Sequence, residues 1–152
     1  MVIQMTSPDT RPRILTALPD HIVVGVDGTE SSLRALDLAA TVARRNESDV
    51  TVVFVRHTPT ISGVTPVDWE SIFGPMQAEV EQAARTRLEG LRWKLVVADG
   101  APAAELERVA GEEGADLLVV GRSKGGPIHR LLEGSVGGHA ATHAPVPVLV
   151  VR

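Results

Sequence analysis

Five short, valine-rich runs alternate along the chain with stretches of helical periodicity, and this alternation most constrains the fold. Each run has five or six residues and is mostly apolar on both of its alternating faces; the runs are His21–Val26, Val50–Val55, Lys94–Ala98, Asp116–Val120 and Val146–Val151. Strands of this kind are buried on both faces, which is typical of parallel strands covered by helices. The runs therefore predict a parallel sheet.

Four segments between or beside these runs are predicted to be helical. In some of these segments apolar residues recur at helical spacing, and in the others residues typical of helix starts and ends lie at the boundaries. The segments are Ser31–Arg45 (capped by Thr29 or Ser31), Gln77–Leu91, Pro102–Glu113 and about Ser135–Ala144. The connection His57–Pro75 has no clear period and is predicted to be irregular, either a lid or a surface loop. The order β-α-β-α-β-α-β-α-β predicts an α/β fold, a three-layer open sheet with helices on both faces.

Composition excludes several classes of protein. A chain of 152 residues with 43% hydrophobic content fits one domain, and the absence of cysteine excludes disulfides and thiolate zinc sites. A net charge of -4 and 3% aromatic residues disfavour a nucleic-acid binder. No apolar run approaches the ~18 residues that span a bilayer, and the first residues do not form a signal peptide. We expect a flexible leader at 1–19, a domain at 20–152, no membrane partner and a cytoplasmic location.

Ligands of open parallel sheets bind beyond the carboxyl ends of the strands. Two of these ends are rich in glycine and polar residues: Gly25–Thr29 after the first strand and Gly121–Gly126 after the fourth, which is followed by Gly134–Val136 at a helix start. Glycines let the backbone approach an anion, and a helix start adds unpaired N–H groups. The second segment is a candidate phosphate site, although turns of this kind need glycine in any case. Neither a Walker motif nor Gly-x-Gly-x-x-Gly is present.

Local charge supports the same segment. Two arginines and a lysine against one glutamate give it a net charge of +2, from Arg122, Lys124, Arg130 and Glu133. The basic residues therefore lie on the glycine loop of an otherwise acidic chain.

From His21 to Arg152 the chain resembles the universal stress protein (UspA) family. Three segments carry the resemblance, in order: Val23–Thr29, Ala115–Gly121, and Leu131–Val136 leading to Ala144–Val151. The resemblance implies a Rossmann-like sheet, related to the adenine nucleotide alpha hydrolases, with strand order 3-2-1-4-5. It further implies a homodimer through the last strand, Val146–Val151, which would otherwise leave an exposed apolar edge.

ATP-binding members of that family carry glycine, two residues, glycine, nine residues, and then glycine with serine or threonine. Gly121 and Gly134-Ser135 occupy the outer positions, but Lys124 stands at the middle one. Lysine there either crowds the loop, at a cost of about 1 kcal/mol if φ is positive, or pairs with a phosphate while Gly125 takes the turn. By resemblance, ATP or AMP, with Mg²⁺ as an option, would contact Val26, Asp27, Gly28, Thr29, Val55, Val120, Gly121, Arg122, Lys124, Gly125, Gly134, Ser135 and Val136.

Two of these residues have a second interpretation. Asp27 either contacts the nucleoside or caps the next helix through the turn at Thr29. Val55 either borders the adenine or is an ordinary core residue.

Two functions remain open from the sequence. In the first, the protein is a stress-response switch whose ATP or AMP occupancy alters dimer or partner surfaces. In the second, it binds no ATP and acts as a dimeric interaction module with an unknown protein partner. Catalysis beyond slow ATP hydrolysis is not expected, and no catalytic residue is assigned.

Three other readings are disfavoured. His139 and His143 lack a third metal ligand, and a receiver phosphorylated on Asp99 lacks the acidic pair and the lysine that it needs. A nucleotidyl transferase lacks its His-x-Gly-His motif, where Gly28–Ser31 stands instead.

Overall fold

The computed structural model describes residues 18–59, 63, 66–122 and 146–152. Its elements, in chain order, are β1 (His21–Gly25), α1 (Glu30–Asn46), β2 (Asp49–Arg56), α2 (Trp69–Arg87), β3 (Trp93–Asp99), α3 (Pro102–Glu112), β4 (Leu117–Gly121) and β5 (Val148–Val151). The five strands match the predicted ones to within two residues. The predicted helix at Ser135–Ala144 and most of the predicted leader lie outside the described residues.

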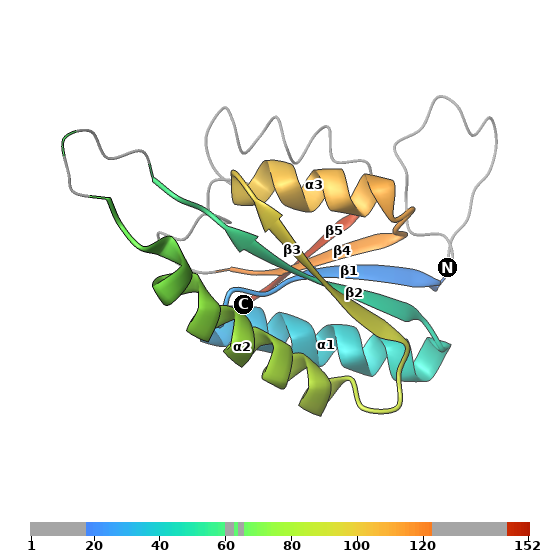
Figure 1. Cartoon of the computed structure of the whole chain (residues 1–152). Coiled ribbons are helices and arrows are strands. Elements are labelled where there is room, and N and C mark those ends of the chain that lie inside the picture. The colour runs from blue at the N-terminus through green and yellow to red at the C-terminus, as the bar shows by residue number, and fades with distance from the viewer. Residues whose placement is uncertain (1–17, 60–62, 64–65, 123–145) are drawn as a thin grey trace, which may run out of the picture.

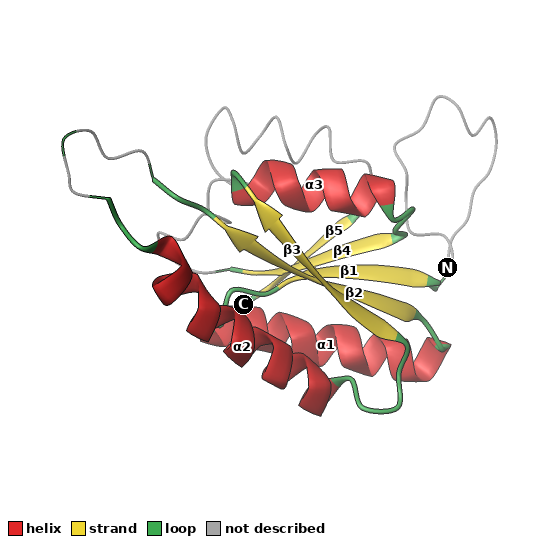
Figure 2. Ribbon diagram, viewed as in Figure 1, coloured by secondary structure: helices red, strands yellow, loops and turns green. Residues whose placement is uncertain are grey.

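The strands form one sheet in the order β3-β2-β1-β4-β5, and every neighbouring pair is parallel. This confirms the predicted fold class and strand order. Helices α1 and α2 cover one face of the sheet and α3 lies on the other, which gives three layers (Figures 1 and 2). Each face carries its own apolar cluster, one against α1 and α2 and one against α3.

Helix α1 forms as its sequence predicts. Thr29 is the N-cap, and its side chain accepts a hydrogen bond from the backbone N–H of Ser32. The residues of the helix that face the sheet are small and apolar, so the helix lies close to β1 and β4; those buried are Ala35, Leu36, Ala39, Ala40 and Ala43. Helix α3 likewise begins at Pro102, where a missing N–H costs nothing.

Helix α2 departs from the prediction at both ends. It begins eight residues before the predicted Gln77, because the Asp68 side chain accepts from the Ser71 N–H at 3.3 Å and Pro75 does not stop the helix. Trp69 stacks on Phe73, which holds the first turns together. The helix ends at Arg87 rather than Leu91, since the chain turns at Gly90, where φ is +81°. The last part of the predicted irregular connection, residues 69–75, is therefore helical.

Pro75 gives a test of this correction. Inside the helix it has no N–H to donate to the carbonyl of Ser71, so we expect Pro75→Ala to raise the free energy of unfolding by about 1–3 kcal/mol. Pro102→Ala is the matched control, because proline at the first position of α3 loses no hydrogen bond; it should lower stability slightly, by less than about 1 kcal/mol. Urea unfolding of both variants measures the difference. Equal effects of the two substitutions would contradict a helical Pro75.

Candidate functional site

A cavity of about 290 Å³ opens at the carboxyl edge of the sheet, where the strands end. Its wall comes from β1 and the following loop, from β2, from α2 and from the start of α3. The lining residues are Gly25, Val26, Asp27, Thr29, Val53, Phe54, Val55, His57, Phe73, Met76, Pro102 and Leu106. The wall is mostly apolar, with Asp27, Thr29 and His57 as its polar side chains. Such a composition suits a flat organic ligand that is oriented by a few polar groups.

The loop after β1 is held by hydrogen bonds to its own side chains. Oδ1 of Asp27 accepts from the Thr29 N–H at 2.9 Å and from the Thr29 hydroxyl at 2.6 Å. Gly28 between them has φ +89°, a value that favours glycine. The Asp27 N–H donates to the Ser32 hydroxyl oxygen at 3.2 Å, which ties the loop to the first turn of α1.

Asp27 therefore does support the turn that caps α1. In the described part of the chain, both bonds that the carboxylate accepts are made to Oδ1. The turn thus does not consume Oδ2, and the capping interpretation and the ligand interpretation of Asp27 are compatible.

Gly121, at the end of β4, is required by packing alone. A Cβ at this position would lie 2.4 Å from the backbone carbon and oxygen of Ser31 and 2.6 Å from the backbone nitrogen of Ser32. These contacts are too short for any real side chain. The first turn of α1 passes directly over the end of β4, so this glycine has a structural cause whether or not a ligand binds nearby.

The remaining described candidates are divided between core and surface. Val26 and Val55 line the cavity, whereas Val120 is fully buried in the sheet. The Arg122 N–H donates to the Val151 carbonyl at 2.7 Å and prolongs the pairing of β4 with β5. Five predicted site residues lie outside the described residues, as do both histidines weighed as metal ligands: Lys124, Gly125, Gly134, Ser135, Val136, His139 and His143.

The structure adds cavity residues that sequence reasoning missed. Phe73 and Met76 come from α2, and His57 and Pro102 follow the ends of β2 and β3. The first two were missed because helix α2 was predicted to begin too late. Asp68, with Glu70 in the first turn, is a helix-start signal that could have placed them.

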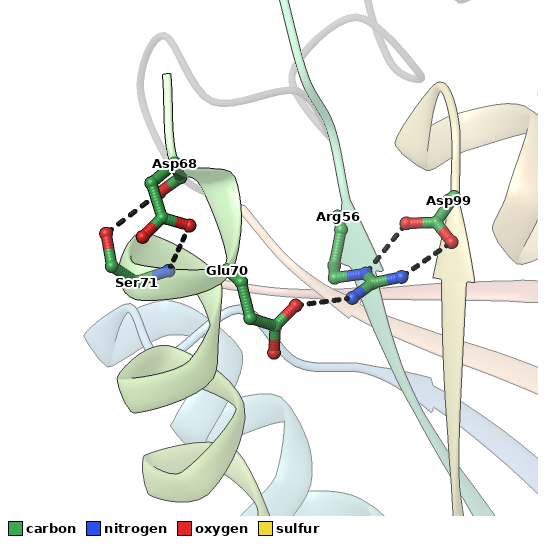
Figure 3. A network of polar contacts seen from close by, with 5 residues as sticks. All are labelled: Arg56, Asp68, Glu70, Ser71 and Asp99. Atoms are coloured by element: carbon green, nitrogen blue, oxygen red, sulfur yellow. Dashed lines mark hydrogen bonds and ion pairs between the residues drawn. The ribbon is translucent and has the colours of Figure 1, made fainter. Parts of the chain in front are cut away.

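An ion-pair network holds α2 to this edge of the sheet (Figure 3). Arg56 and Asp99 are the last residues of β2 and β3 and are partners in the register. Their side chains form a bidentate pair, Nε to Oδ1 at 2.7 Å and Nη2 to Oδ2 at 2.8 Å. Nη1 of Arg56 also reaches Oε2 of Glu70, in the first turn of α2, at 3.5 Å.

The hydrogen bond from Arg56 lowers the pKa of Asp99, and the same hydrogen bond raises the pKa of Arg56. Asp99 is thereby kept ionised and engaged.

The described residues contain neither a cluster of metal ligands nor a membrane-spanning helix. Within residues 18–59, 63, 66–122 and 146–152, no three histidine or acidic side chains gather in a way that could hold a metal ion. Among the described helices, none combines the length and the apolar character that crossing a bilayer requires.

Comparison with known proteins gives one consistent result. Residues 19–152 match the model of the universal stress protein family. Universal stress protein Rv1636 of Mycobacterium tuberculosis is 30% identical over 145 residues, covering 86% of this chain and 94% of the relative. Universal stress protein YxiE of Bacillus subtilis is 27% identical over 147 residues, covering 88% and 99%.

Solved structures agree with the sequence relatives. A universal stress protein crystallised in complex with cAMP is 28% identical, with a TM-score of 0.66, over 90% of this chain and 98% of the other. A protein of the same family from Burkholderia pseudomallei is 26% identical, with a TM-score of 0.62, over 87% and 95%.

The packing argument for Gly121 predicts that Gly121→Ala lowers the free energy of unfolding by about 3 kcal/mol or more, because the Cβ meets backbone that cannot move aside. Gly90→Ala is the control. Gly90 has open space around it and a φ of +81°, so only the left-handed backbone is penalised, by about 1 kcal/mol. Urea unfolding compares the two. If Gly121→Ala were the milder substitution, the close approach of α1 to β4 would be wrong.

Proposed function

The chain belongs to the universal stress protein family, and from that premise we propose that it is an adenine-nucleotide switch of the stress response, acting in the cytoplasm. ATP, with Mg²⁺, or AMP would occupy the cavity at the carboxyl edge. The observation that carries the proposal is this apolar cavity with Asp27 on its wall. The relative solved with cAMP, at 28% identity, supports an adenine nucleotide as the class of ligand.

The residues of the cavity suit the parts of such a ligand. Val26, Val55, Phe73 and Met76 offer apolar surface for a planar base. Oδ2 of Asp27 suits a ribose hydroxyl or a Mg²⁺ ion that accompanies ATP, since both seek a carboxylate oxygen. The base and the sugar are therefore assigned to the described part of the site.

We assign the phosphates to the segment after β4, on the sequence motif. Arg122 and Lys124 supply positive charge, while Gly125 and Gly134–Val136 supply backbone N–H groups. Binding, not turnover, is the proposed activity, and it would act by changing the surface that the protein offers to a partner.

The direct test is the identity of any nucleotide released when freshly purified protein is denatured, followed by titration calorimetry with ATP and Mg²⁺ and with AMP. We expect saturable binding and a rise in melting temperature, because a ligand of the native state stabilises it. Folded protein that gives neither heat nor a melting shift with either nucleotide refutes the proposal.

Filling the cavity tests its position. Val55→Phe places a larger side chain in the cavity wall and should weaken AMP binding by about tenfold or more. A tenfold loss of affinity corresponds to about 1.4 kcal/mol of binding free energy. Val96→Phe is the matched control, since Val96 is also a partly buried valine packed against the α3-side cluster but does not line the cavity. Calorimetry on both variants decides. Equal affinities in the two would place the nucleotide elsewhere.

The second function, a dimeric interaction module, is favoured by β5. This strand lies at the edge of the sheet, is entirely apolar and leaves Leu149 38% exposed. Exposed apolar edge strands pair with other chains unless they are blocked. We propose a homodimer through Val146–Val151, and dimerisation is compatible with nucleotide binding.

We expect the wild type to be a dimer and Leu149→Lys to be a monomer, because lysine on an edge strand opposes pairing. Leu18→Lys is the control, since Leu18 is 67% exposed and precedes β1. Light scattering after size-exclusion chromatography gives the mass of each. A dimer that survives Leu149→Lys, or a monomeric wild type, counts against the β5 interface.

A further inference from the structure

His57 is fixed at the cavity by the ends of β2 and β3. The residue before it, Arg56, accepts the Gly100 N–H on its carbonyl at 3.1 Å and pairs its side chain with Asp99 (Figure 3). Nδ1 of His57 lies 3.1 Å from the carbonyl oxygen of Gly100. The last residue of β2 and the residue after it are thus joined to the last residue of β3 and the residue after it. The hydrogen bond to the Gly100 carbonyl therefore orients the imidazole at the cavity wall.

This contact decides which nitrogen of His57 carries the proton. A carbonyl oxygen can only accept a hydrogen bond, so the contact with Gly100 requires a hydrogen on Nδ1. In the neutral imidazole, Nε2 then has a lone pair and acts as an acceptor. The cavity wall consequently holds a second acceptor besides the Asp27 carboxylate, on a different strand end.

The two acceptors are placed for different parts of a nucleoside. Asp27 follows β1 and is tied to the start of α1, whereas His57 follows β2 and is tied to β3. Both side chains line the cavity, so a nucleoside whose ribose contacts Asp27 would have its base as the part left to contact His57. An acceptor there favours a base that presents an N–H donor.

We propose that His57 selects the base, its Nε2 accepting a hydrogen bond from the 6-amino group of adenine. This inference rests on the proposed function, because it assigns a residue within the same cavity. His57 matters only to ligands that carry the amino group; ligands without it leave Nε2 without a partner in the complex.

The test compares AMP with purine riboside 5′-monophosphate, which lacks only the 6-amino group. We expect the wild type to prefer AMP roughly three- to tenfold, the usual worth of one hydrogen bond. His57→Phe keeps a planar ring but has no acceptor, so both ligands should bind with the affinity that the wild type has for the purine riboside. His57→Gln offers a carbonyl oxygen and should restore part of the preference.

Asp27→Asn is the matched control within the cavity. It keeps an oxygen for the turn at Thr29 but removes the charge, so it should weaken both ligands while leaving the preference for AMP. Circular dichroism and urea unfolding establish that each variant is folded.

The outcomes separate this inference from the proposed function. If the wild type binds both ligands equally, or if the preference for AMP survives in His57→Phe, then His57 does not select the base. The proposed nucleotide site is not contradicted by that result. If neither ligand binds to folded wild type, the proposed function itself fails and the role of His57 fails with it. Loss of the preference in His57→Phe alone supports the assignment.

Discussion

Parallel pairing of every strand is the constraint on which the rest of the structure depends. Parallel strands end at a common edge, so the residues that follow β1, β2 and β3 meet although they are far apart in the sequence. The sheet itself is covered on both faces and its strands are almost wholly apolar. At the carboxyl edge, polar side chains follow the strands in the loops, and Asp27 and His57 both lie there.

Two local contacts give this edge its shape. The first turn of α1 lies against the end of β4 so closely that only glycine fits at position 121. The bidentate pair of Arg56 and Asp99 joins β2 to β3 and reaches toward α2, which carries part of the cavity wall. The first contact also changes how the glycine motif is interpreted, because Gly121 would be needed here even in a protein that binds no nucleotide.

The sequence predicted most of this fold because its signals are local. Valine-rich runs gave the strands to within two residues, Thr29 gave the cap of α1, and Pro102 gave the start of α3. The bounds of helix α2 were predicted wrongly at both ends. Pro75 lies inside the helix although proline is typical of a helix boundary, and the predicted helix ran past Gly90, where the chain turns. That error hid Phe73 and Met76, and with them one wall of the cavity.

By itself the sequence determined the class of fold and the family, because apolar periodicity, helix caps and motif order are local features of the chain. It also predicted the edge of the sheet at which we propose that a ligand binds. Tertiary structure decided what each residue at that edge does. It showed that Asp27 supports a turn through one carboxylate oxygen and that any side chain at position 121 would clash with the backbone of Ser31. It also showed that the Gly100 carbonyl requires a hydrogen on Nδ1 of His57. Such roles depend on contacts between segments distant in sequence, and no local pattern encodes those distances.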